Sequence, residues 1–291
     1  MLAYRFIYCL AWLITLLPLR VLYMFSDLMY VLMYYMVGYR KKVVRENMKN
    51  AFPEKSEKEL SRIERGFYHY FCDLIIETLY EMNMSRAEVD KRITFSNIEG
   101  LCEQYELGKS VMVMTAHYGN WEWIINFPSF IPKDYYMNVI YRELSNKKVD
   151  KLVHELRTKY GAGLIEKKDL LRTMYRMNKA GQVGNFWMIS DQTPNIHSIH
   201  YWTRFLNQQT AVVTGTETLA RKFDYPVFYA EIIRVKRGYY HCTFQPVELA
   251  PKSAGEFEIS EKYMRLVEGT IERQPEFWLW THRRWKHTPR D

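Results

Sequence analysis

Short strands and amphipathic helices alternate along most of the chain, and this alternation limits the fold more than any other feature. Apolar runs at residues 111–114, 137–141 and 183–189 are of the length and type that predict buried strands. The other predicted elements are helices at 43–92, 149–160, 169–179, 211–223 and 260–273 and strands at 226–235 and 239–247. The pattern predicts an α/β domain with a mostly parallel or mixed central sheet flanked by helices.

The N-terminus is apolar over two runs, residues 6–19 and 21–37. Neither run alone reaches the roughly 20 residues that span a bilayer. Together they fit one tilted span, a re-entrant pair or an interfacial hairpin, and the alternative is a pair of core helices in a soluble protein. A basic cluster at Arg40–Lys42 and Arg45 follows, as on the cytoplasmic side of membranes. We therefore expect residues 1–42 to be membrane-associated, with an α/β domain at 43–291 on the cytoplasmic side of the membrane.

The chain has 291 residues and a formal net charge of +8, which favours an anionic partner, either lipid or nucleic acid. A nucleic-acid-binding protein would leave the apolar N-terminus without a role, and no known binding motif is present. A non-catalytic membrane scaffold is a further alternative. None of the four cysteines lies in a C-x-x-C spacing, so we expect no metal ion and no cofactor.

The segment His117-Tyr118-Gly119-Asn120-Trp121-Glu122 follows the predicted strand at 111–114. A helix is predicted to begin near Asn120 or Trp121, and ligands of open α/β sheets bind where strands end and helices begin. Within one helix, His117 and Glu122 would lie about 140° apart. With His117 in the loop, Glu122 could instead fix the imidazole tautomer while His117 acts as general base. The alternative is a structural histidine bonded to backbone.

This segment resembles the H-x4-D/E motif of glycerolipid acyltransferases, and in particular of the late (lauroyl and myristoyl) acyltransferases of lipid A biosynthesis. Other blocks are similar to that family in the same order. They are Tyr141-Arg142, Ser190-Asp191-Gln192, Thr214-Gly215-Thr216 and the string from Gln274 to Lys286. One departure is Phe205-Leu206-Asn207, where the family often has Phe-x-Gly. Asparagine tolerates left-handed backbone, so the turn can survive.

The resemblance implies that domain 43–291 is catalytic and acts at the cytoplasmic face of the inner membrane. It implies transfer of a fatty acyl group from acyl carrier protein or acyl-CoA to a hydroxyl of a lipid A precursor. A lysophospholipid, an aminolipid or another glycolipid is the alternative acceptor. His117, Glu122 and Asp191 are the expected catalytic residues, and Asp191 would orient His117 or anchor the acceptor. Arg142 would stabilise an oxyanion or pair with Asp191 or Glu122. The remaining candidates for substrate binding are Asn120, Trp121, Gln192, Arg283 and Arg284. In the C-terminal string, basic residues interleaved with tryptophans could bind phosphate and lie at the lipid interface, namely Arg283, Arg284 and Lys286 with Trp278, Trp280 and Trp285. The alternative is packing of a final strand with solvated basic residues.

Overall fold

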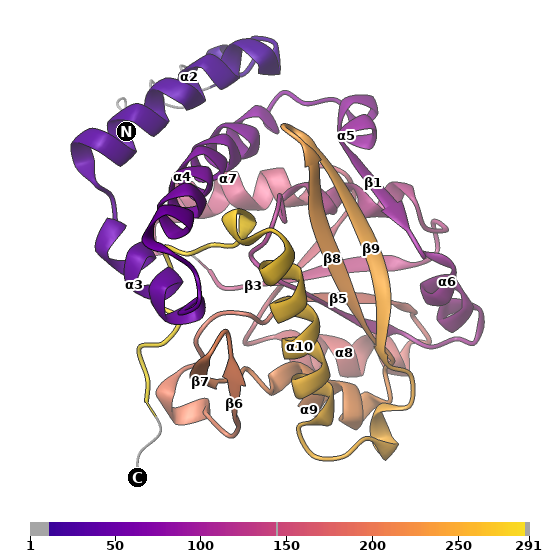
Figure 1. The fold of residues 1–291 in the computed structure, drawn as a ribbon. Coiled ribbons are helices and arrows are strands. Elements are labelled where there is room, and N and C mark those ends of the chain that lie inside the picture. The colour runs from indigo at the N-terminus through magenta and orange to yellow at the C-terminus, as the bar shows by residue number, and fades with distance from the viewer. Residues whose placement is uncertain (1–11, 144, 289–291) are drawn as a thin grey trace.

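A seven-stranded mixed sheet forms the centre of the computed structural model, which describes residues 12–143 and 145–288 (Figure 1). The strand order is β1 (Ile93–Ser96), β9 (Tyr239–Glu248), β8 (Val227–Lys236), β2 (Val111–Thr115), β5 (Gly184–Ile189), β3 (Tyr136–Tyr141) and β4 (Gly163–Glu166). Every pairing is parallel except β8 with β9. The predicted α/β class is confirmed. The sequence did not predict β1 and β4, which are only four residues long.

Helices cover both faces of the sheet, and the side chains of β2 alternate between the two layers. Met112 and Met114 pack on one side, whereas Val111 and Val113 pack on the other. The first face carries α4 (Glu57–Tyr80), α8 (Leu170–Lys179), α9 (Gly215–Phe223) and α10 (Glu258–Arg273). The second carries α5 (Arg86–Arg92), α6 (Glu99–Glu106) and the 3-10 helix η2 (Trp123–Ser129). The continuous apolar run of β2 is explained, because all five of its residues are buried.

The boundaries of four predicted helices differ in the structure. Pro53 separates α3 (Lys41–Ala51) from α4, and Ser56 caps α4 together with Glu59 in a capping box. The helix expected from Asn120 begins at Trp123 as η2 and contains Pro128. The helix expected from 211 begins at Gly215, because β7 (Gln208–Ala211) forms a hairpin with β6 (Trp202–Phe205). The helix expected over 149–160 is α7 (Lys147–Thr158).

The hairpin turn between β6 and β7 is the place where the chain has Leu206-Asn207 in place of the family's x-Gly. Both residues are left-handed, with φ of 48° and 62°. Such a pair is what a tight two-residue hairpin turn requires. The side chain of Asn207 also donates to the carbonyl of Ala51 at 3.0 Å, so the asparagine preserves the turn and fixes it to the end of α3.

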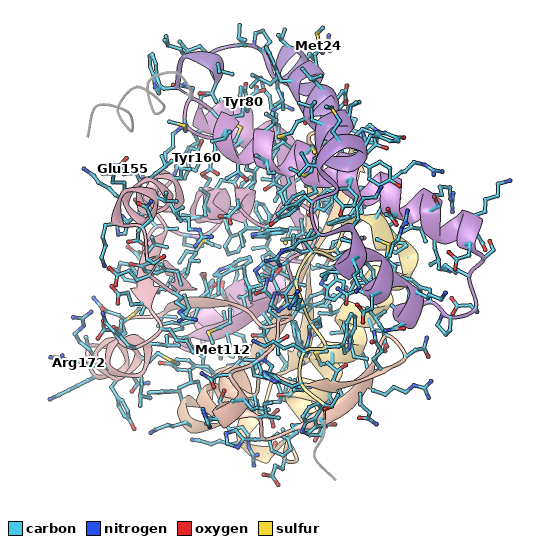
Figure 2. The ribbon with its side chains drawn as sticks, turned by 90° about the vertical axis from the view of Figure 1, so that its left-hand side faces the viewer. Met24, Tyr80, Met112, Glu155, Tyr160 and Arg172 are labelled. Atoms are coloured by element: carbon cyan, nitrogen blue, oxygen red, sulfur yellow. The ribbon has the colours of Figure 1, made fainter. Side chains whose placement is uncertain are left out.

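The N-terminal helices α2 (Leu19–Val31), η1 (Leu32–Val37) and α3 continue into α4, and α2 packs along α4. One face of α2 is buried, and the opposite face exposes apolar side chains that include Met24, Phe25 and Leu28. Met24 points away from the molecule at the end opposite Arg172 of α8 (Figure 2). No single helix of the described residues is long and apolar enough to span a membrane. The two segments Leu19–Val37 and Lys41–Ala51, which are bent by 92° relative to each other, reach the length and apolar composition of a membrane span only when they are taken together. Part of the first apolar run, residues 6–11, lies outside the described residues.

Candidate active site

The loop after β2 carries the predicted motif and is held by the C-terminal segment. The N–H of Gly119 donates to the carbonyl of Phe277 at 3.0 Å, and the N–H of Leu279 donates to the carbonyl of His117 at 3.1 Å. Gly119 has a φ of 59°, and a Cβ there would lie 3.0 Å from the backbone oxygen of Ile232. Only glycine fits this close approach. His117 therefore lies in the loop and outside any helix, as the fold-back hypothesis requires.

The imidazole of His117 is bonded to Asp191, which follows β5. Nδ1 lies 2.7 Å from Oδ1 of Asp191, and the backbone N–H of His117 donates to Oδ2 at 3.0 Å. The parallel register pairs Thr115 with Ile189, so residues two positions beyond each strand meet at the same edge. A carboxylate at Nδ1 requires that nitrogen to carry the proton, which leaves Nε2 of the neutral ring with its lone pair.

Asp191 is buried, and its two oxygens accept three hydrogen bonds. The third comes from Nε1 of Trp278, which donates to Oδ2 at 2.8 Å. Burial alone would raise the pKa of Asp191. The charge of His117 and the hydrogen bonds from His117 and Trp278 outweigh burial and hold that pKa below its usual value. The carboxylate is thus ionised and fixed at neutral pH, which suits it to orient the imidazole.

The imidazole of His117 is partly exposed to solvent. The side chain is 19% exposed, and no described residue hydrogen-bonds to Nε2. The ring of Trp121 lies 5.1 Å away, near perpendicular to the imidazole. The site therefore presents the basic Nε2 of His117 beside the indole of Trp121, an arrangement that suits a hydroxyl substrate.

Glu122 differs from its predicted place, because it does not hold the imidazole. Its carboxylate accepts two hydrogen bonds from Arg157 of α7, at 2.7 and 2.9 Å, and one from Nε1 of Trp121 at 3.0 Å. Burial would raise the pKa of Glu122, but Arg157 and the indole outweigh it and lower that pKa. The contact with the imidazole that was expected of Glu122 is made by Asp191, and Glu122 instead bonds the guanidinium of Arg157.

Replacement of Glu122 by glutamine should lower kcat about tenfold to a hundredfold, because Arg157 loses its charged bidentate partner. Initial rates of acyl transfer measure the effect. Glu155→Gln on α7, the helix that carries Arg157, is the matched control, since the pair of Glu155 with Lys151 is exposed and 3.7 Å apart. We expect the control to stay within about twofold of the unchanged protein. Equal rates for the two variants would show that the Glu122–Arg157 pair has no part in catalysis.

Several residues expected to bind substrate are placed elsewhere by the fold. Asn120 is 0% exposed and bonds to Glu77 and to the N–H of Trp123, so it supports the loop from behind. Arg142 is exposed beyond β3. The expected ion pair of Arg142 with Glu122 or Asp191 is wrong, because Arg157 occupies Glu122, while His117 and Trp278 occupy Asp191.

The basic residues of the C-terminal string do not form the single phosphate site that was expected, because some are buried and others are exposed. Arg284 is 1% exposed and donates to the carbonyl of Ala211 at 2.8 Å, and burial lowers its pKa to about 10. Arg283 is exposed, and Gln192 is half-buried next to Asp191. Trp278 and Trp280, expected near lipid, are buried. Of the two arginines in the string, only Arg283 remains available to a phosphate.

The sequence missed three contributors to the site, namely Arg157, Trp278 and His282. Arg157 lay in an ordinary amphipathic helix with no signal of its own. Trp278 and His282 stand in the recognised C-terminal string, so the match of that string to the family was the signal that could have found them. Nε2 of His282 accepts from the N–H of Thr193 at 3.3 Å, two residues after Asp191.

His282 should make the fold less stable in acid. Burial lowers its pKa to about 4, below the value of about 6.5 for an exposed histidine. Between these values the unfolded chain binds more protons than the folded one, so stability falls as pH falls from 6.5 toward 4. Melting curves at pH 7 and pH 5 should show a smaller loss of Tm for His282→Gln than for the unchanged protein. A variant at the exposed His154 is the control, and an equal loss in all three would contradict the assignment.

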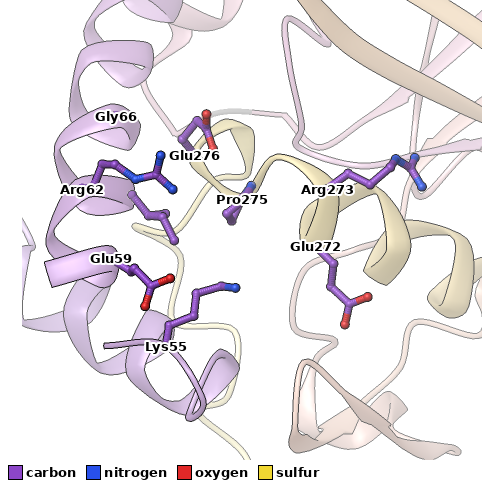
Figure 3. A pocket seen from close by; sticks show the side chains of 9 residues that line it. Lys55, Glu59, Arg62, Gly66, Glu272, Arg273, Pro275 and Glu276 are labelled. Carbon is purple, nitrogen blue, oxygen red and sulfur yellow. The ribbon is translucent and has the colours of Figure 1, made fainter. Parts of the chain in front are cut away.

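A cavity of about 420 Å³ lies between α4 and the end of α10 (Figure 3). Side chains of both charges line it, including Lys55, Arg62, Glu272 and Glu276. It borders Pro275 of η5 (Pro275–Phe277), on the segment that continues to Trp278. His117 and Asp191 are not among its lining residues, so the cavity is separate from the candidate site.

The fold and site can be compared with known proteins. The family model described as bacterial lipid A biosynthesis acyltransferase matches residues 2–287. The lipid A biosynthesis lauroyltransferase of Escherichia coli (strain K12) is 26% identical over 285 residues, covering 96% of this chain and 89% of that protein. The palmitoleoyltransferase of the same organism is 20% identical over 250 residues, covering 86% and 80%. These findings define the chain as an acyltransferase. It belongs to the bacterial lipid A biosynthesis acyltransferase family, as its sequence motifs predicted.

Proposed function

We propose that the protein transfers a fatty acyl group from acyl carrier protein to a hydroxyl of a lipid A precursor, with His117 as general base. The bond between Nδ1 of His117 and Asp191 is the observation that carries the proposal. It fixes the ring so that Nε2 accepts the proton of the acceptor hydroxyl. Acyl-CoA is the alternative donor.

The reaction proceeds by attack of the acceptor oxygen on the thioester carbonyl. His117 takes the hydroxyl proton, the carbon–sulfur bond breaks, and the imidazolium returns the proton to the departing thiolate. Asp191 stabilises the imidazolium between these steps. The products are the ester and the free thiol of the carrier, so no other reactant is needed.

Charge on the carbonyl oxygen needs a donor at the site, and Arg157 fits this role better than the predicted Arg142. Its Nε and Nη2 are used by Glu122, which leaves Nη1 without a described partner. A guanidinium fixed in this way loses little conformational freedom when it binds an oxyanion or a phosphate. Glu122 acts through Arg157 as a positioning residue.

Mass spectrometry of lipid A from a strain that lacks the gene tests the acceptor. We expect one acyl chain fewer than in the parent strain, restored by the intact gene and not by the His117→Ala gene. Unchanged lipid A with altered phospholipids or aminolipids would show that the acceptor is not a lipid A precursor. The proposed acyl-transfer chemistry would still hold. Purified protein supplied with acyl carrier protein or acyl-CoA then identifies the donor by rate.

The outward face of α2 supports membrane association. Met24 and Leu28 are 69% and 57% exposed, and such clusters of apolar side chains are unusual on the surface of a soluble protein. Met24→Gln/Leu28→Gln should weaken binding to anionic phospholipid vesicles about tenfold or more in flotation assays. Leu107→Gln/Val235→Gln, at exposed apolar residues on other elements, is the matched control. Equal flotation of both double variants would contradict a role for α2.

A further inference from the structure

A buried carboxylate outside the catalytic group lies directly behind the His117 loop. Glu77 of α4 is fully buried and accepts three side-chain hydrogen bonds. Tyr23 donates to Oε1 at 2.7 Å, while Asn120 and Tyr240 donate to Oε2 at 2.8 Å each. In each contact Glu77 is the acceptor, so both of its oxygens are used. A glutamine there would keep all three contacts only if Tyr23 reversed its hydroxyl and accepted from the amide.

The contact with Asn120 reaches the middle of the catalytic loop. Asn120 lies between His117 and Glu122, and its own Oδ1 accepts the N–H of Trp123, where η2 begins. The indole of Trp123 donates to the backbone carbonyl of Glu77 at 3.3 Å. The carboxylate and carbonyl of one residue thus fix both the loop and the start of the helix that follows.

The contact with Tyr23 reaches α2, the helix whose other face exposes apolar side chains. Nearby, Ser26 of α2 donates to Asp73 of α4 at 2.7 Å. Both bonds are buried and join the same two helices, but only Tyr23 shares its acceptor with the loop. Variants at Tyr23 and Ser26 can therefore distinguish the attachment of α2 to α4 from the contact of α2 with the His117 loop.

We propose that Glu77 is a positioning residue through which α2 holds the His117–Glu122 loop in its reactive geometry. The inference rests on the proposed function for its effect on rate, whereas its effect on the loop is independent of the substrate. In this arrangement α2 is part of the support of the active site as well as a surface for lipid. Loss of either end of the Tyr23–Glu77–Asn120 chain loosens the same loop.

The test compares Tyr23→Phe, Ser26→Ala and Glu77→Gln in the full-length protein in detergent. Tyr23→Phe should lower kcat about tenfold, with KM for the acyl donor within about twofold, because the loop and not the donor site is disturbed. Glu77→Gln should lower kcat about tenfold, because it keeps the three contacts only by reversing the Tyr23 hydroxyl. Ser26→Ala should leave kcat unchanged.

Hydrogen exchange of peptides covering residues 117–125 provides a readout that needs no substrate. Exchange should accelerate in Tyr23→Phe and Glu77→Gln and stay unchanged in Ser26→Ala. Equal exchange and equal rates in Tyr23→Phe and Ser26→Ala would overturn the proposal, even if Glu77→Gln fails to fold. Absence of acyl transfer by the unchanged protein, with the expected exchange pattern, would count against the proposed function alone.

Discussion

Replacement of His117 by alanine or glutamine should lower kcat for acyl transfer by about 10⁴-fold, the upper range for loss of a general base. Neither side chain accepts a proton from a hydroxyl near neutral pH. The loop itself should survive, because its backbone is held by Phe277 and Leu279 and not by the imidazole. Rates with purified protein measure the loss, and Tm confirms that the variants are folded.

The control for His117 is His197→Ala, an exposed histidine on the loop after Asp191. It should retain the rate of the unchanged protein. A His117→Ala protein that is folded and transfers acyl groups at an undiminished rate would exclude the general-base mechanism. The acceptor and donor would then have to be activated by another group.

Replacement of Asp191 by asparagine should lower kcat by about 10³- to 10⁴-fold, through a change of tautomer. The oxygen of the amide would face the N–H of His117 and the indole of Trp278, because both are donors. Its NH₂ would then face Nδ1, so the ring proton would move to Nε2, where the acceptor hydroxyl binds. The remaining activity should rise with pH as hydroxide replaces the lost base.

Trp278→Phe tests the effect of the orientation of Asp191 on the rate without changing the charge of Asp191. It removes one of three hydrogen bonds to the carboxylate and leaves the charge, so we expect a loss of about tenfold. An Asp191→Asn protein as active as Trp278→Phe would show that the charge is dispensable. The low pKa of Asp191 also implies stability that is present above pH 4 and lost as pH falls through the lower pKa of the folded state.

Local pattern was enough to place most of the elements that carry the site. The runs at 111–114 and 183–189 were recognised as strands because both faces of each are buried, which leaves no polar alternation. Short strands were not predicted, because their sequence pattern is too brief to recognise. Four-residue strands such as β1 and β4 carry too few residues for a period, and the sheet that stabilises them is assembled from distant segments.

The C-terminal string shows how a correct family assignment led to a wrong placement. Trp278, Trp280 and Arg284 were expected at a lipid or phosphate surface because exposed aromatic and basic residues gather there. The fold instead brings this segment alongside the His117 loop, where Trp278 bonds Asp191 and Arg284 is buried. Composition describes what a segment prefers to contact, whereas packing decides what it contacts.

The sequence by itself determined the α/β class, the position of His117 at the end of a buried strand, and membership in the acyltransferase family. Only the tertiary structure decided which carboxylate serves the histidine. Glu122, five positions away, was the natural candidate, but the parallel pairing of β2 with β5 brings Asp191 to Nδ1 across 74 residues of chain. Sequence separation does not determine which strands become neighbours in the sheet. Strand order and register therefore assigned the partner of His117, whereas the packing of α7 assigned Arg157 to Glu122.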